Sequence, residues 1–265
     1  IKNSGWMNGL DSIIEVFSDV SNIKNPKIDV RQEDATKLPF KDNYFDAVFT
    51  DPPYYDNIAY SFFSDFFYVR LKRVVGELFP DLFSTLVVPR ESEIIVDGPN
   101  KDKKFFVEML SKAFKEITRV LKNNGIAIIV YAHKTTAGWE TLINSLLNSG
   151  LIVTAAWPIR TELKGRLISQ STASLASSIY MVCRKRKKEP VRNYEKVKTD
   201  MQDYLNEKLD FLWSQEISGA DFFISAIGSA IEVFGKYERI EDTADNPITV
   251  PQLLDDVRKI VSEYA

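Results

Sequence analysis

Residues 105–131 join an amphipathic helical pattern directly to a wholly apolar run, and this junction restricts the possible fold more than any other feature. Apolar side chains recur at helical spacing over residues 105–122, and Asn124-Gly125 is typical of a helix C-terminus. Residues 126–131 (IAIIVY) follow at once and predict a strand that is buried on both faces. A helix leading straight into such a strand predicts an α/β fold, with a parallel sheet covered on both faces.

The same alternation extends over most of the chain. Further helices are predicted over residues 9–20, 58–75 and 139–148, and further strands over 28–31, 47–50, 151–157 and 178–183. A long Ser/Thr-rich loop connects the last two strands, which we expect to form an antiparallel pair at one edge of the sheet. Prolines punctuate residues 79–100 and predict an irregular surface insertion there.

After the last strand the pattern becomes wholly helical. Three helices are predicted over residues 194–213, 221–234 and 251–264, with Gly235 ending the second and Pro251 beginning the third. The sequence therefore predicts three regions. They are an N-terminal helical segment at 1–26, an α/β core at 27–188 that carries the insertion 79–100, and a C-terminal helical region at 189–265.

Scarce residue types exclude several classes of protein. The chain has one cysteine, Cys183, and one histidine, His133, so it can form no internal disulfide and no His/Cys zinc cluster. We interpret both as structural residues and expect no metal site. None of the 11 glycines are spaced as G-x-G, and GxxxxGK is absent. An intact dinucleotide fingerprint and a phosphate-binding P-loop are thereby excluded.

No apolar run approaches the roughly 18 to 20 residues needed to cross a bilayer, so we expect no membrane association. The single cysteine fits a reducing compartment, which predicts a cytoplasmic location.

The tetrapeptide Asp51-Pro52-Pro53-Tyr54 follows a buried strand, and open parallel sheets bind ligands at the carboxyl ends of their strands. The Asp51 carboxylate and the Pro52 carbonyl can each accept one N–H of a base amine. The nitrogen lone pair, otherwise delocalised into the ring, then points toward an electrophilic methyl group. Tyr54 offers a ring for base stacking, worth about 1–3 kcal/mol. The alternative is a strand-terminating turn that Asp51 merely caps.

These motifs resemble the S-adenosylmethionine-dependent amino-methyltransferases, which methylate adenine N6 or cytosine N4 in DNA. The chain is most similar to the C-terminal portion of the large adenine-specific DNA methylases of archaea and bacteria. The resemblance runs from about residue 34 to 186. It is carried by residues 33–35 (EDA), 38–40 (LPF), 45–48 (FDAV), 51–57 (DPPYYDN), 64–68 (SDFFY) and 116–122 (EITRVLK), with a further match at 219–223 (GADFF).

The resemblance implies methyl transfer to a base amine, with S-adenosylmethionine as the cofactor. Adenine N6 in DNA is favoured over cytosine N4 as the target. Asp51 and Pro52 would receive the amine, and Asp34 would bond the adenine ring of the cofactor. The implied site residues are Asp51, Pro52, Pro53 and Tyr54 for catalysis, Asp34 and Ala35 for the cofactor, and Tyr55, Asn57 and Arg166 for the substrate.

One part of the family pattern is missing. The FxGxG cofactor loop after the first strand and the acidic residue after the next strand are both absent. We therefore infer that the chain starts downstream of two strands and their loop. The expected fold is a Rossmann-like methyltransferase sheet without its first two strands, followed by a C-terminal helical appendage. A missing N-terminal portion or a partner chain would supply the cofactor loop.

Other interpretations stay open at this point. The chain is alternatively an RNA base amino-methyltransferase, or a non-catalytic fragment or nucleic-acid-binding subunit of a split methylase. Cytosine C5 methylation is disfavoured because Cys183 lacks a preceding proline. We expect most aromatic residues of 60–68 to pack in a helical core. The basic run 184–188 is either a phosphate contact or a solvated linker, and the acidic pI of about 5.5 does not favour a strong nucleic-acid surface.

Overall fold

A computed structural model describes residues 6–21, 28–56, 58–160, 177–186, 191–215, 217, 219–235, 237 and 239–264. The chain divides into two compact units, Ile1–Glu33 and Asp34–Ala265. The first unit contains helix α1 (Trp6–Ser21), which confirms the helix predicted there. The strand predicted at 28–31 is wrong, because these residues form no regular structure. Ile28 and Val30 are exposed, and apolar alternation makes no strand without a surface to bury it.

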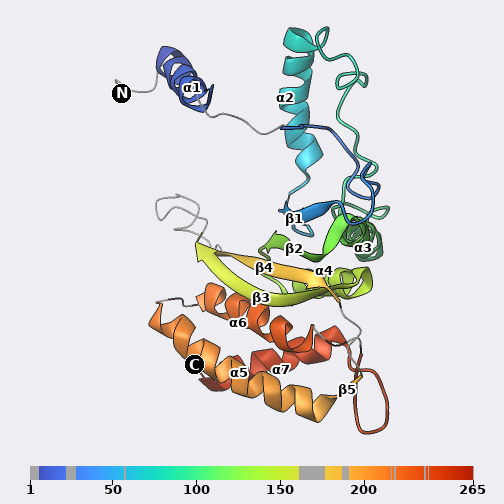
Figure 1. Ribbon diagram of the computed structural model, residues 1–265, viewed down its shortest axis with the longest axis vertical. Coiled ribbons are helices and arrows are strands. Elements are labelled where there is room, and N and C mark those ends of the chain that lie inside the picture. Colours follow the sequence, from blue (N-terminus) through green and yellow to red (C-terminus); the bar gives the residue numbers. More distant parts are fainter. Residues whose placement is uncertain are drawn as a thin grey trace. The chain divides into compact units, whose positions relative to one another are not determined.

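The second unit is built on a four-stranded mixed sheet in the order β1-β2-β4-β3 (Figure 1). Strand β1 (Phe45–Thr50) pairs in parallel with β2 (Leu121–Tyr131). Strand β4 (Ser177–Lys185) runs antiparallel to both β2 and β3 (Leu151–Arg160). The α/β class and the antiparallel pair are thus confirmed, in a sheet that is mixed rather than wholly parallel.

The junction of helix α3 (Lys103–Val120) with β2 differs from the prediction. The strand begins at Leu121 and contains Gly125, so Gly125 does not cap the helix. The pairing of β1 with β2 is irregular here, since Phe45 is opposite Leu121 while Ala47 is opposite Ile126. A Cβ on Gly125 would lie 2.9 Å from the Asp46 carbonyl oxygen. Gly125 therefore allows two strands to approach closely.

Helix α2 (Tyr60–Val75) lies between β1 and the irregular segment 79–100, which confirms both predictions for this stretch. Helix α4 (Thr136–Ser149) joins β2 to β3. After β4 come the short strand β5 (Arg192–Asn193), helix α5 (Tyr194–Ser214), helix α6 (Gly219–Phe234), the short strand β6 (Ile240–Glu241) and helix α7 (Val250–Tyr264). Strands β5 and β6 pair in parallel as a separate small sheet.

The C-terminal helices share one hydrophobic core with the sheet. A single cluster of buried residues extends from α3 through β2 and β4 into α5, α6 and α7. Helix α6 packs against β3, and the Ala156 N–H donates to Glu232 of α6 at 2.6 Å. The boundary predicted after residue 188 thus separates segments that pack together, and Asp34–Ala265 is one compact unit.

The two faces of the sheet are covered unequally. The strand register places Ile129 and Tyr131 of β2 on the same face as Met181 of β4, and all three are fully buried. The opposite face carries Phe49 and Trp157, which are 61% and 53% exposed. In the part of the chain that the structure describes, this second face is largely uncovered, and β1 has a free outer edge. We expected both faces of the sheet to be covered, but the described residues cover only one of them.

Candidate functional site

The Asp51-Pro52-Pro53-Tyr54 loop leaves the carboxyl end of β1, as the sequence predicts. Asp51 is exposed and Pro52 is buried. The Tyr54 hydroxyl donates a hydrogen bond to Oδ1 of Asp51 at 2.6 Å. Among the described residues, Oδ2 of Asp51 has no such partner. The loop thus holds one carboxylate oxygen internally and leaves the other available to a ligand.

Tyr54 is fixed from three sides. Its half-buried ring meets the Tyr131 ring edge-on, with 5.2 Å between the centroids. Ser178, at the start of β4, hydrogen-bonds the Tyr54 hydroxyl as well. Burial, and after it the Asp51 carboxylate, raises the pKa of Tyr54 well above its usual range. The hydroxyl therefore keeps its proton and acts as the donor that orients Asp51.

Tyr55 turns away from the open part of the loop. Its φ of 53° is left-handed, and its ring packs edge-on against Phe106 and His133, at centroid distances of 5.3 and 5.7 Å. The Tyr55 carbonyl accepts the Val96 N–H at 3.0 Å, which attaches the insertion to the loop. The structure therefore places Tyr55, a predicted substrate contact, against the core. Asn57 and Arg166, the other predicted substrate contacts, lie outside the described residues.

An Asp56–His133 pair belongs to the site and was not foreseen from the sequence, which suggested only a structural role for His133. The histidine is 3% exposed, and its Nε2 lies 3.1 Å from Oδ1 of Asp56. The Thr135 N–H donates to Nδ1 at 3.1 Å, which assigns the imidazole proton to Nε2, facing Asp56. The pair connects the end of β2 to the loop after β1. No sequence signal could reveal it, because the two residues are 77 positions apart.

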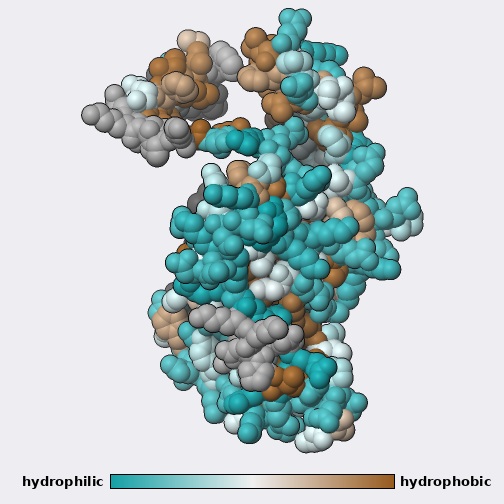
Figure 2. Space-filling model, turned by 45° about the vertical axis from the view of Figure 1, so that its right-hand side comes forward, coloured by the Kyte–Doolittle hydropathy of each residue, from teal (hydrophilic) through white to brown (hydrophobic). Residues whose placement is uncertain are grey.

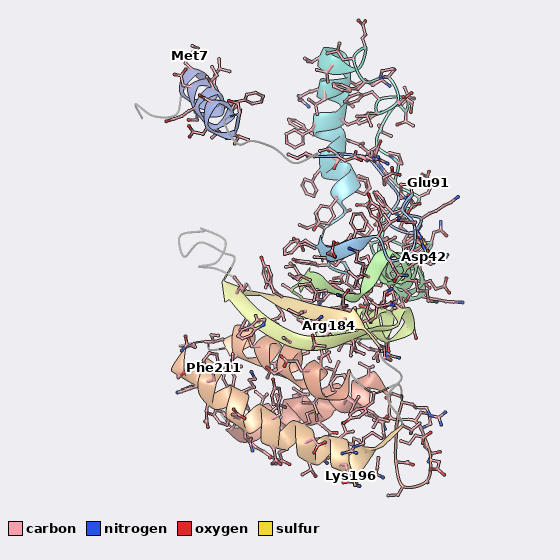
Figure 3. All side chains as sticks on the ribbon, viewed as in Figure 1. Met7, Asp42, Glu91, Arg184, Lys196 and Phe211 are labelled. Atoms are coloured by element: carbon pink, nitrogen blue, oxygen red, sulfur yellow. The ribbon has the colours of Figure 1, made fainter. Side chains whose placement is uncertain are left out.

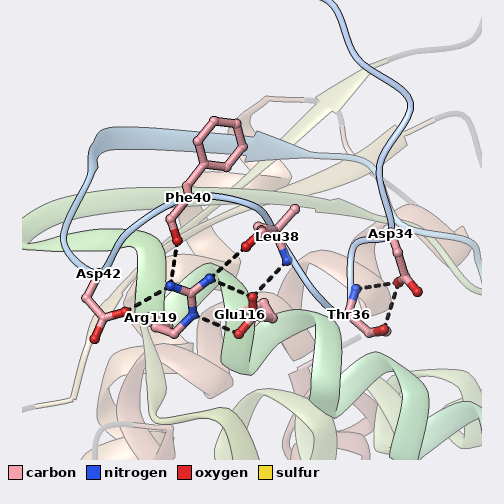
Figure 4. A network of polar contacts seen from close by, with 7 residues as sticks. All are labelled: Asp34, Thr36, Leu38, Phe40, Asp42, Glu116 and Arg119. Atoms are coloured by element: carbon pink, nitrogen blue, oxygen red, sulfur yellow. Dashed lines mark hydrogen bonds and ion pairs between the residues drawn. The ribbon is translucent and has the colours of Figure 1, made fainter.

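The predicted cofactor residues lie in the loop before β1. Asp34 and Ala35 are both exposed, and Oδ1 of Asp34 accepts from the Thr36 N–H and hydroxyl at 2.8 and 2.7 Å (Figure 4). These hydrogen bonds lower the pKa of Asp34. The carboxylate is therefore ionised at neutral pH and can accept a further hydrogen bond.

An arginine-centred network fixes the chain between Asp34 and β1 (Figure 4). The Arg119 guanidinium donates to the carbonyls of Leu38 and Phe40 at 2.9 and 2.6 Å. It also contacts the carboxylates of Asp42 and Glu116, each at 2.8 Å. The Arg119 hydrogen bond lowers the pKa of Glu116, which also accepts the Leu38 N–H. The motif at 116–122 thus anchors the loop that follows Asp34.

The described residues fit S-adenosylmethionine only in part. Asp34 supplies an acceptor suited to the amino group of an adenine ring. No glycine occurs between Leu10 and Val75, so neither loop allows the close backbone approach that the methionine end of the cofactor needs. The described part of the chain also has no group of three or more His, Cys, Asp or Glu side chains placed to hold a metal ion.

Comparison with models of protein families gave no match, and neither did comparison with curated proteins. Among the described residues, no helix is both long and apolar enough to span a membrane.

Proposed function

We propose that the Asp51-Pro52-Pro53-Tyr54 loop holds the exocyclic amino group of a nucleic-acid base for methylation, with adenine N6 in DNA as the target. The observation that carries this proposal is the Tyr54–Asp51 hydrogen bond, which orients one exposed carboxylate at the carboxyl end of β1. Open α/β sheets bind ligands at the carboxyl ends of their strands. A strand-terminating turn alone would need no half-buried tyrosine directed at its carboxylate.

The loop's own groups suffice to activate the amine. Oδ2 of Asp51 accepts one N–H and the Pro52 carbonyl accepts the other, so the nitrogen lone pair turns out of the ring plane. When bound, S-adenosylmethionine supplies an electrophilic methyl group to that lone pair. The alkylated nitrogen must then lose one proton, and the Asp51 carboxylate is the acceptor that the loop provides. The base itself rests on the exposed part of the Tyr54 ring.

The cofactor site is completed, in this proposal, by an N-terminal portion outside these residues or by a partner chain. Asp34 contacts the adenine end, and the added segment carries the FxGxG loop. Within the described ranges, the outer edge of β1 is free and the sheet face around Phe49 and Trp157 is open, which supports this proposal. The proposed architecture is a Rossmann-like methyltransferase sheet without its first two strands, in a cytoplasmic protein.

A methyl-transfer assay tests the amine-holding role. Unmethylated DNA and labelled S-adenosylmethionine are incubated with the protein together with its completing segment or partner. Asp51→Ala is expected to abolish transfer, while Asp46→Ala is the matched control, because Asp46 is an exposed aspartate of β1, the strand that leads into Asp51. Full activity of Asp51→Ala would refute the role. Transfer to RNA in place of DNA would favour the RNA enzyme.

Calorimetric titration of S-adenosylmethionine tests the shared cofactor site. The chain alone is expected to bind the cofactor weakly, since it holds only the adenine end, and the completed protein is expected to bind it tightly. If the completed protein also fails to bind at millimolar concentration, the chain is a non-catalytic subunit.

A further inference from the structure

Helix α2 has one face that the insertion covers with polar contacts. The Tyr68 hydroxyl donates to the Thr85 carbonyl at 2.9 Å, and Asp65 accepts the Val88 N–H at 2.9 Å. Lys72 also donates to the Thr85 carbonyl. Asp65, Tyr68 and Lys72 follow helical spacing and share one side of the helix. The insertion is therefore fixed to this side.

The opposite side of α2 is aromatic and exposed. Phe63 and Phe67 are 68% and 62% exposed, and Phe66 and Val74 also lie on this side. Apolar surface is visible over α2 in Figure 2, interrupted by polar surface. The expectation that these aromatics pack in a core is therefore wrong. A cluster of exposed aromatic side chains on one side of a helix indicates an interaction site.

The charged side chains on this exposed side are positive. Arg70 and Arg73 lie among the phenylalanines, and the Arg70 guanidinium is 3.5 Å from the centroid of the Phe66 ring. Among the described residues, neither arginine forms an ion pair with a carboxylate. Asp65, the only acidic residue of α2, lies on the covered side and pairs with Arg90. The exposed side thus combines flat aromatic rings with two unpaired cations, although the whole chain has a net charge of −3.

The N-terminal end of α2 lies beside the proposed methylation site. Tyr60, the first residue of the helix, is close enough to Asp51 for the carboxylate to raise its pKa, after the larger effect of burial. The Glu93 carboxylate accepts the Ser61 N–H at 3.0 Å and holds this end of the helix in place. The aromatic side therefore leads away from the site along the helix.

We propose that Phe63, Phe66, Phe67, Arg70 and Arg73 form a platform that binds single-stranded nucleic acid, or the unstacked strand beside a flipped base. The rings stack on successive bases, and the arginines contact phosphates. This inference rests on the proposed function, because it assigns the strand on which that site acts. Charge decides the choice of partner, since an apolar protein partner would not need two cations within the contact surface.

The helix limits the length of strand in contact. Its 16 residues span about 24 Å at 1.5 Å per residue. At the spacing of about 3.4 Å per nucleotide in a stacked strand, that length corresponds to at most roughly seven nucleotides, and to fewer in an unstacked strand. A labelled oligonucleotide of about this length, without a required sequence, is therefore the appropriate probe.

Fluorescence anisotropy with a labelled mixed-sequence DNA strand tests the platform. Phe67→Leu keeps apolar bulk but removes the ring, and it is expected to weaken binding about tenfold, within the range for loss of one base–aromatic stack. Phe211→Leu is the matched control, because Phe211 is a 52% exposed phenylalanine on α5 (Figure 3). Arg73→Gln is expected to lower the salt slope by about one, whereas Lys112→Gln on α3 leaves it unchanged.

Unchanged affinity and salt slope in both platform variants would overturn the proposal. A self-association that Phe67→Leu abolishes, without binding of the strand, would also overturn it and make this side a protein interface. The test of the platform and the test of base methylation can fail independently of each other. Methyl transfer without platform effects refutes only the platform, and platform-dependent strand binding without methyl transfer refutes only the methylation.

Discussion

The Tyr54 hydroxyl and the Asp51 carboxylate form the contact on which the proposed chemistry depends. Tyr54→Phe keeps the ring against Tyr131 and removes only the donor that orients Asp51. A hydrogen bond to a charged group contributes about 1.5–3 kcal/mol, so we expect kcat/KM for methyl transfer to fall about tenfold or more. Unchanged kinetics would show that Asp51 needs no orientation by Tyr54.

Gly138 of helix α4 packs directly against the buried His133 ring, and this contact affects the stability of the fold. A Cβ on Gly138 would lie 2.2 Å from Nδ1 of His133, and the ring cannot retreat from its buried position. Gly138→Ala should therefore lower the free energy of unfolding by about 1–3 kcal/mol, as overpacking does. Urea denaturation measures this loss. The Gly138→Ala/His133→Ala double variant should lose less than the sum of the two single variants, and strict additivity would contradict the clash.

Short-range sequence signals identified part of the site. Asp51-Pro52-Pro53-Tyr54 could be read directly, because its residues are adjacent and follow a recognisable strand. The Asp56–His133 pair and the contact of Ser178 with Tyr54 could not, because both depend on which strand ends meet in three dimensions. Their roles follow from the sheet order.

Periodicity predicted most helices and strands correctly, but it did not predict what covers them. The pattern of α2 identified a helix, yet its aromatic side is exposed. Helical periodicity shows which residues share a face and does not reveal whether another segment buries that face. At the junction of α3 and β2, Leu121 fits the helical and the strand pattern equally, so the pattern could not locate the boundary.

The Glu232 carboxylate of α6 connects α5 to β3. The tyrosine of α5 that binds this carboxylate makes the stability of the fold depend on pH. The Tyr204 hydroxyl donates to Glu232 at 2.6 Å, and Glu232 also accepts the Ala156 N–H. Burial, and after it Glu232, raises the pKa of Tyr204 in the folded state. The resulting stabilisation is fully present below the unfolded tyrosine pKa of about 10 and is lost as the pH rises above it.

Denaturation of wild type and Tyr204→Phe at several pH values tests this linkage. Wild type should be the more stable protein at pH 8, and the difference should shrink as the pH rises above about 10. A difference that stays constant with pH would contradict the raised pKa.

Across the whole molecule, the C-terminal helices are part of the folded core. Buried residues of α5, α6 and α7 belong to the same cluster as those of β2 and β4. A chain that ends at Arg186 exposes that cluster, so we expect it to lose the near-ultraviolet circular dichroism of a packed core and to bind an apolar dye. If the shortened chain kept cooperative unfolding, these helices would be an independent appendage.

The sequence predicted the α/β class, but not which surfaces of the sheet stay open. Open surface is a property of the assembled unit, since each strand's neighbours and covering helices must be known first. In the described part of the chain, β1 has a free edge and the face around Phe49 and Trp157 is open, which agrees with the absence of a G-x-G loop from the sequence. Both observations favour a sheet and a cofactor site completed from outside these residues.

Identification of the methylated atom is the decisive test of base-amine methylation at the Asp51-Pro52-Pro53-Tyr54 loop. DNA treated with the completed protein and labelled S-adenosylmethionine is digested to nucleosides, which are then separated and analysed by mass spectrometry. We expect N6-methyladenine with wild type and none with Asp51→Ala. Label on cytosine C5, or N6-methyladenine formed equally well by Asp51→Ala, would contradict it.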